Sequence, residues 1–344
     1  MKRTGDRTVR IGRDRVHTLG RALGAVSSAF ALAVLAGCSQ DAPLTTPDGS
    51  PISTTTTRVA EVNIVSPERD YSKTCLAPTD VDAGQTDVEH IVVTDPALLD
   101  AVCALGIGSK VSAVAAAPGS VPAYLGPQLT SVPTIGATPN ADAVQAADAD
   151  IVLATPATAA TANSFGDTRV VTISPGGGWR GQFQSVADAL GRSSSGTRLL
   201  DEFDTEATKT GRRMDAAHSQ VSLIRFTGDG EEVAGTDTFA GQILSAVGVQ
   251  RPAPQRSPES FALTDKTFTD ADADLIYVSF VGADGETHGK EVLLSDKWLD
   301  MGAPTWKRVL AVDDDVWYQS SGLAAGWLVL NDLKKSLNGD SMGY

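Results

Sequence analysis

The amino-acid sequence predicts an α/β protein of two similar lobes, each with a central, mostly parallel sheet, joined by one long helix. Three observations support this prediction. From about residue 89, short apolar runs alternate with helical stretches, as they do in parallel sheets covered on both faces. A long helical pattern at 197–219 breaks the alternation. The stretch DADIVLAT at 148–155 is then echoed by DADLIYVS at 272–279.

The first lobe is predicted to span residues 86–190. Its apolar runs are short and lie between helical stretches such as PALLDAVCALGI and ADAVQAADAD, as expected for buried strands of a parallel sheet. The expected strands are His90–Val93, Val111–Ala115, Ile151–Ala154 and Val170–Ile173.

The connecting helix is predicted at 191–219. Its apolar residues recur every three or four positions, which places them on one face of a helix; they are Leu199, Leu200, Phe203, Ala207 and Met214. At 1.5 Å per residue, a helix over 197–219 would be roughly 30 Å long, about the width of a small domain.

The second lobe is predicted to span residues 220–344, where the alternation of strands and helices resumes. A helix is expected at GQILSAVGV, and a last one begins at about Gly322. The expected strands are Val221–Phe226, Leu275–Val278 and Val309–Val312.

The N-terminal 37 residues have the pattern of an export signal. Residues 1–21 are basic, and residues 22–37 are uncharged but short for a membrane span, which needs roughly 20 residues. The following L-A-G-C resembles a lipobox, which implies cleavage before Cys38 and a lipid on it. A plain membrane anchor, or a chance cysteine, is the alternative. Residues 38–85 are then a flexible tether, which places the protein on the outer face of the cell membrane.

Charge limits the possible partners. Residues 1–37 hold seven of the 28 basic side chains and two of the 42 acidic ones, so the mature chain has a net charge near −19. Such a charge argues against nucleic acid and against electrostatic attraction to anionic lipid. We therefore expect membrane contact through the lipid anchor only, and a monomer.

Two cysteines remain after Cys38, at positions 75 and 103. Disulfides persist in exported proteins, so we expect Cys75 and Cys103 to pair and to fasten the segment before the first lobe onto that lobe. Two buried free thiols are the alternative.

The stretch SPGGGWRG at 174–181 has the G-x-G-x-x-G spacing of a dinucleotide-binding turn. About forty helical residues follow it, however, where a nucleotide fold needs a second strand. We interpret it as a loop at the carboxyl end of a strand, the edge where open α/β sheets place ligands. The loop presents Trp179 and Arg180. In the alternative, Trp179 packs beneath the loop.

No motif of an enzyme or a metal site was found. The sequence has neither G-x-S-x-G nor H-E-x-x-H, and His90, His218 and His288 stand far apart. The three aspartates at 313–315 are interpreted as a solvated turn rather than a calcium site. We therefore expect a protein that binds a ligand without catalysis and without a cofactor.

The otherwise uncharged strand VSLIRF contains one charged residue, Arg225, near its carboxyl end. A buried guanidinium is costly without a partner, so Arg225 either pairs with an internal carboxylate or points into a ligand cleft. We favour the cleft. The rings of Trp317 and Tyr318 follow another strand and could reach the same cleft, although ordinary core packing is the alternative.

Several stretches together resemble a known family. They are EHIVVTDPALLDAVCALGIGSKV, PTIGATPNADAVQAADADIVLA, VSLIRFTGD, DTFAGQILSAVGVQRP and WKRVLAVDDDVWYQSSGLAAGWLVLNDL. Their order and spacing resemble the helix-backbone class of substrate-binding proteins of ABC importers. The resemblance is to the ferric-siderophore binders, and most closely to the FecB-like lipoproteins of mycobacteria. It implies a ligand cleft between the lobes and capture of a ferric siderophore for an iron-uptake ABC transporter.

The resemblance also implies roles for particular residues. It assigns a cleft arginine to Arg225, an aromatic wall to Trp317, and a bordering turn to Phe239, with Trp179 at the end of the first lobe's last strand. A siderophore already saturates Fe(III), so direct metal ligands are not needed. A guanidinium can bind the chelate's oxygens, and aromatic rings can stack on its organic body.

Two implications stay open. In the family, an acidic residue on each lobe docks onto the permease. Asp142 matches in the first lobe, but residues 259–274 contain no clean match in the second. The same class also binds haem and cobalamin, for which Tyr318 or Tyr124 could supply an axial ligand. A cell-envelope interaction protein without a transport role is the alternative from a different class.

Overall fold

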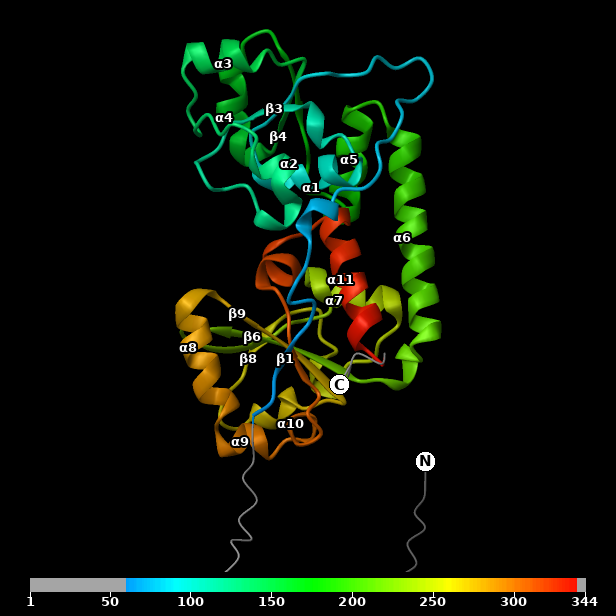
Figure 1. Cartoon of the computed structure of the whole chain (residues 1–344), viewed down its shortest axis with the longest axis vertical. Coiled ribbons are helices and arrows are strands. Elements are labelled where there is room, and N and C mark those ends of the chain that lie inside the picture. The colour runs from blue at the N-terminus through cyan, green and yellow to red at the C-terminus, as the bar shows by residue number, and fades with distance from the viewer. Residues whose placement is uncertain (1–59, 339–344) are drawn as a thin grey trace, which may run out of the picture. The chain divides into compact units, whose positions relative to one another are not determined.

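The computed structural model describes residues 60–338 and confirms the predicted fold class: two mostly parallel sheets, with one long helix between them in the chain (Figure 1). Within these residues, no helix is both long and apolar enough to cross a membrane. The predicted signal segment 1–37 and Cys38 lie outside the described residues.

The first sheet has four parallel strands in the order β3-β2-β4-β5. The inner strands β2 and β4 are buried along their whole length, as the apolar runs predict. The strands are β2 (Ile91–Val93), β3 (Val111–Val114), β4 (Ile151–Ala154) and β5 (Arg169–Thr172). The α-helices around them are α1 (Leu99–Ala104), α2 (Gly126–Thr130), α3 (Ala141–Ala147), α4 (Ala159–Ala162) and α5 (Gly178–Ala189).

The second sheet has six strands in the order β1-β10-β9-β6-β7-β8. The first four are parallel, and β7 and β8 add an antiparallel edge that the sequence analysis missed. The strands are β1 (Asn63–Ile64), β6 (Val221–Thr227), β7 (Gly230–Val233), β8 (Phe261–Ala262), β9 (Leu275–Phe280) and β10 (Val309–Ala311). Its α-helices are α7 (Phe239–Val247), α8 (Gly282–Leu293), α9 (Asp296–Leu299), α10 (Gly302–Thr305) and α11 (Leu323–Ser336).

The long helix α6 (Ser193–Arg213) lies within the range predicted for the connecting helix. Its buried positions include Leu199, Phe203 and Ala207, and Arg212 and Arg213 in its last turn suit the negative end of the helix dipole. Gly211 allows close packing on α7, because a Cβ there would lie 1.8 Å from a backbone oxygen of α7. The connecting helix is therefore fixed tightly to the second lobe.

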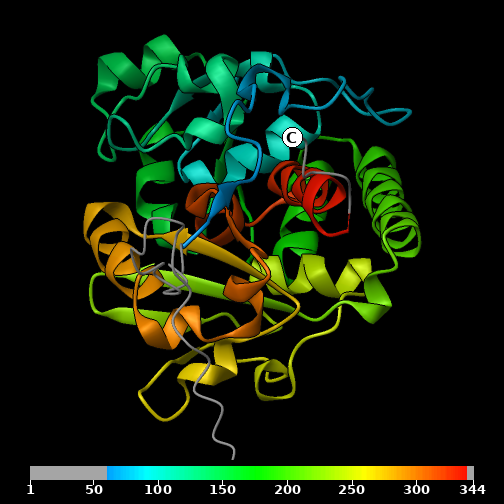
Figure 2. The same ribbon diagram turned by 60° about the horizontal axis from the view of Figure 1, so that its bottom comes forward.

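Helix α11 contacts elements from both halves of the chain: α1, α5, α6 and α7 (Figure 2). Its first turn is capped by a side chain of α1. Both carboxylate oxygens of the buried Asp100 accept hydrogen bonds, from the N–H groups of Ala324 and Ala325, at 2.9 Å each. A carboxylate at this end of a helix also interacts favourably with the helix dipole.

Residues 60–85, which we call the strap, are not the flexible tether that the sequence predicted. The strap begins with β1, which pairs with β10 of the second sheet, and it reaches the first lobe through a disulfide between Cys75 and Cys103 (Figure 1). Between these points, Arg69 binds both oxygens of the buried Asp332 at 2.6 Å. Composition alone predicts disorder because it does not count strand pairing, ion pairs or covalent bonds made to distant residues. The predicted disulfide is confirmed.

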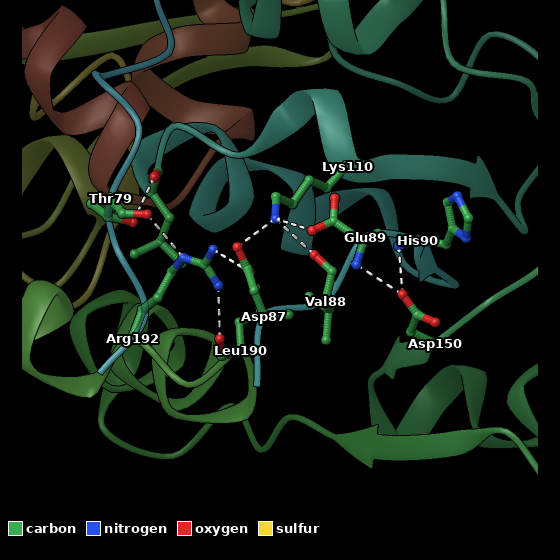
Figure 3. Close-up of polar contacts among 10 residues, drawn as sticks. Thr79, Asp87, Val88, Glu89, His90, Lys110, Asp150, Leu190 and Arg192 are labelled. Carbon is green, nitrogen blue, oxygen red and sulfur yellow. Dashed lines mark hydrogen bonds and ion pairs between the residues drawn. The ribbon is translucent and has the colours of Figure 1, made fainter. Parts of the chain in front are cut away.

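A polar network joins Thr79 of the strap, and Asp87 just after the strap, to the corner between α5 and α6 (Figure 3). The fully buried Arg192 donates to Asp87 at 2.6 Å and to the carbonyl oxygens of Leu190 and Thr79 at 2.8 and 3.3 Å. Lys110 binds the same Asp87 at 2.6 Å. Every N–H group of Arg192 that makes these contacts is shielded from water, so the network fixes the strap firmly.

Candidate ligand-binding site

The carboxyl ends of β6, β9 and β10 meet at one edge of the second sheet, where ligands are expected in open α/β folds. Arg225 of β6 donates from Nε and Nη2 to the two oxygens of Asp314, at 2.8 Å each. Ser279 of β9 and Gln319 also donate to Asp314, both at 2.9 Å. These residues form a bidentate ion pair with hydrogen bonds to its carboxylate.

Arg225 therefore takes the alternative that the sequence analysis did not favour, because an internal carboxylate balances its charge. Its side chain is still 23 % exposed, and its guanidinium lies 5.3 Å from the ring centre of Tyr318. The prediction of an unpaired arginine in the cleft is wrong, but the structure brings Arg225 and Tyr318 together at the predicted edge.

The ion pair keeps Asp314 charged although it is only 9 % exposed. Burial alone would raise the pKa of Asp314, but hydrogen bonds from Arg225, Gln319 and Ser279 outweigh burial and leave the pKa below its ordinary value. The interpretation of residues 313–315 as a solvated turn is thus wrong for Asp314. Its neighbour Asp313 accepts a hydrogen bond from Tyr71 of the strap.

We expect this pair to make stability depend on pH at the acidic end. Because the folded-state pKa of Asp314 is lowered, its contribution is present above ~pH 4 and is lost as the pH falls through the folded value. The difference in unfolding free energy between the wild type and Asp314→Asn should therefore shrink between about pH 7 and about pH 3. Urea unfolding at a series of pH values measures it; a difference that stays constant would contradict the assignment.

A hollow of about 670 Å³ lies beside this edge, at the carboxyl ends of β9 and β10 and beneath the strap. Its volume is in the range of small-molecule sites. We call it the strand-end hollow. Apolar groups make most of its walls, and two cations, two carboxylates and a phenol lie among them; its lining includes Val65, Arg69, Tyr71, Phe280, Glu286, Lys290, Leu293 and Asp313.

The sequence analysis missed this hollow because it assigned residues 38–85 to a tether. One signal was present: Arg69 and Tyr71, a cation and the first aromatic ring of the mature chain, end a segment of small and polar residues. Such side chains are unusual in a spacer and typical of binding surfaces.

The structure brings Trp179 and Phe239 into contact, but in the core rather than at the wall of a cleft. Their ring centres lie 5.7 Å apart in an edge-on arrangement, and Trp179 is equally close to Phe203 of α6. Trp179 is 5 % exposed and Phe239 8 %, so neither ring has an open face. The alternative for Trp179, packing beneath its loop, is the arrangement that the structure has. Arg180 covers the ring at 4.3 Å.

Trp317 and Tyr124 are also core residues rather than cleft walls. Trp317 is fully buried and donates from Nε1 to Asp332 at 2.9 Å. Tyr124 is 4 % exposed and donates its hydroxyl to Asp100 at 3.0 Å. The periodicity of apolar residues did not predict that these rings are buried, because a ring at the end of a strand can point either into the core or toward the cleft.

Asp142 is exposed in the first turn of α3, and its docking role remains a prediction. Among residues 60–338, no three His, Cys, Asp or Glu side chains gather in a way that could hold a metal ion.

Solved structures of low sequence identity share this fold. Staphylococcus aureus SirA complexed with staphyloferrin B is 18 % identical with a TM-score of 0.59, covering 74 % of this chain and 94 % of that one. The periplasmic heme-binding protein RhuT from Roseiflexus sp. RS-1 is 23 % identical with a TM-score of 0.54, covering 73 % and 98 %.

Sequence comparison adds a relative and a family. "Probable siderophore-binding lipoprotein YfiY" of Bacillus subtilis (strain 168) is 27 % identical in an alignment 177 residues long that covers 46 % of this chain. The match spans about half of that relative, 53 % of its length. Residues 91–316, which include most of both sheets, match the family described as periplasmic binding protein. The chain belongs to the periplasmic binding protein family.

Proposed function

We propose that the protein captures a ferric siderophore outside the cytoplasmic membrane and delivers it to an iron-uptake ABC transporter. The strand-end hollow carries this proposal, because it lies at the ligand edge of the second sheet and has the volume of a small-molecule site. The family of binding proteins, the probable siderophore-binding relative and the staphyloferrin B complex of SirA support the choice of ligand.

The chemistry of the hollow suits a preformed chelate. Phe280 and Tyr71 offer ring surface to an organic body. Lys290 is exposed and pairs with Glu286 at 2.5 Å, and its remaining N–H donors can approach oxygen atoms of the ligand. The guanidinium of Arg225, on β6 beside β9, lies 5.3 Å from the ring centre of Tyr318. These two residues are not among the lining residues of the hollow; we propose that the ligand reaches them. Since the chelator saturates the iron, the protein needs to supply no ligand to the metal.

The remaining predicted residues take supporting roles in this proposal. Trp179 and Phe239 pack between the lobes, and Tyr124 and Trp317 fix Asp100 and Asp332. Lipidation of Cys38, attachment to the outer face of the membrane, docking of Asp142 on a permease and a monomeric state are parts of the same proposal.

The test is a titration of the purified protein with ferric siderophores, followed by quenching of tryptophan fluorescence. We expect Arg225→Ala to weaken binding by about 1.5–3 kcal/mol, since it removes a charged hydrogen-bond donor. Arg198→Ala is the matched control, because Arg198 is an exposed cation on α6 away from the strand ends. Its affinity should equal that of the wild type.

A second variant separates binding from folding, because Arg225→Ala leaves Asp314 buried without its partner. The double change Arg225→Met and Asp314→Asn removes both charges and should bind as weakly as the single variant. Wild-type affinity in the double variant would take Arg225 out of the site. Failure of every ferric siderophore to bind would refute the proposed function.

Titration with haem in the same assay tests the tetrapyrrole alternative, because the heme-binding protein RhuT shares this fold. An axial tyrosine would shift the haem absorption bands, and Tyr318→Phe would abolish that shift. Binding of wall glycan but of neither iron ligand would favour the envelope-interaction alternative.

A further inference from the structure

A second hollow lies at the opposite end of the second sheet, at the amino ends of β6, β9 and β10. Its volume is about 670 Å³, and it shares no lining residue with the strand-end hollow. We call it the amino-end hollow. Its lining includes Asp215, Gln220, Asp274, Trp306, Arg308 and Asn338.

Trp306 stands at this hollow with 77 % of its surface exposed, more than any other large apolar side chain among residues 60–338. By contrast, Trp179, Trp298 and Trp317 are each at most 5 % exposed. An exposed indole offers a flat apolar face that the fold itself does not use.

The backbone around the hollow is also unusual. Lys307, directly after Trp306, has a φ of 57°, and Asp215 of the hollow has a φ of 50°. This left-handed region is unfavourable for residues that carry a Cβ, and such strain gathers at functional sites. Of the four such non-glycine residues between 60 and 338, Asp215 lines the hollow, and Lys307 lies between two residues that do.

Two charged side chains of the hollow, Asp274 and Arg308, keep unused hydrogen-bonding capacity. Asp274 accepts one bond, from the N–H of Gln220 at 2.8 Å, and a carboxylate can accept several. Arg308 uses only Nη2, at 3.3 Å, for the Leu337 carbonyl and the Asn338 amide oxygen. Donors and acceptors are thus mixed around one apolar ring.

This mixture fits a saccharide. A sugar ring has C–H groups on its faces, which pack on an indole, and hydroxyls on its edges, which both donate and accept hydrogen bonds. An alkyl ligand would find too little apolar wall here. We infer that the amino-end hollow is a saccharide-binding site, with Trp306 as the platform for a sugar ring and Gln220 and Asp274 as hydroxyl partners.

The proposed location of the protein indicates the source of the saccharide. Glu61, near the start of the described chain, forms an ion pair at 2.8 Å with Lys307, next to Trp306. Figure 1 shows this blue start of the chain beside α10. The described chain therefore begins next to the amino-end hollow, and the residues that follow, Val62, Ile64 and Val65, line the strand-end hollow. Under the proposed lipid anchor the protein stays at the cell envelope, so we expect an envelope glycan.

The experiment uses the five tryptophans of the chain. The purified protein is labelled with 5-fluorotryptophan, and its ¹⁹F NMR spectrum is recorded during titration with a disaccharide of N-acetylglucosamine and with oligosaccharides released from purified cell wall. Trp306→Phe assigns the signal of Trp306. We expect a saccharide to shift that signal and to leave the signals of the buried tryptophans in place.

Variants then test the contacts. Trp306→Ala should weaken saccharide binding about tenfold, and Gln220→Ala should also weaken it. Leu294→Ala is the matched control, because Leu294 is 68 % exposed and lies outside the hollow. The inference is overturned if no saccharide moves the Trp306 signal, or if Trp306→Ala binds as well as the wild type. Ferric-siderophore affinity should be unchanged in Trp306→Ala, so failure of the proposed function would be seen separately.

Discussion

Replacing both Cys75 and Cys103 by serine should lower the free energy of unfolding by about 3–4 kcal/mol. The disulfide closes a loop of 28 residues and is the covalent link between the strap and α1. Without it, the unfolded chain gains freedom, and the strap is held to the first lobe by hydrogen bonds such as that from Thr79 Oγ1 to the Leu105 carbonyl, 2.8 Å long. Urea unfolding followed by circular dichroism measures the loss.

The wild type with its disulfide reduced is the control, and it should match the double serine variant. Siderophore affinity should also fall in both, because the strap supplies Arg69 and Tyr71 to the strand-end hollow. A reduced wild type as stable as the oxidised one would show that the bond does not hold the strap.

Arg192→Ala should lower the free energy of unfolding by about 3 kcal/mol. The side chain is 1 % exposed and binds a carboxylate and two backbone carbonyls. Its removal leaves buried carbonyl oxygens without donors and opens space at the corner between α5 and α6. Thermal unfolding followed by fluorescence gives the change in stability.

Arg198→Ala is a suitable comparison for this prediction, because it removes the same side chain six residues further along. Arg198 is about half exposed and pairs with Glu202 within α6, a contact of at most about 1 kcal/mol. Similar losses of unfolding free energy in the two variants would contradict the prediction that Arg192 stabilises the fold because it is buried.

Much of the fold could be predicted because most of its strands and helices produce a local pattern of apolar residues in the sequence. The strand expected at Val221–Phe226 is β6, and the apolar stripe around Phe203 is the buried face of α6. β1 could not be found in this way. It has two residues, and it exists only because it pairs with β10, almost 250 residues later.

The site was predictable in its position but not in its details. The sequence shows that a charge such as Arg225 needs a partner, but it does not show which of its many carboxylates is the partner. Asp314 is 89 residues away and reaches Arg225 because β6 and β10 both flank β9. For the same reason, the sequence predicted that Trp317 follows a strand, but not that its ring is buried in the core.

The Cys75–Cys103 bond also has a consequence for biogenesis. A thiol pair of this kind stays reduced in the cytoplasm and oxidises after secretion. The disulfide-bonded fold therefore forms after export, in the compartment where the protein works. Heterologous production directed to an oxidising compartment should therefore yield more correctly folded protein than production in the cytosol.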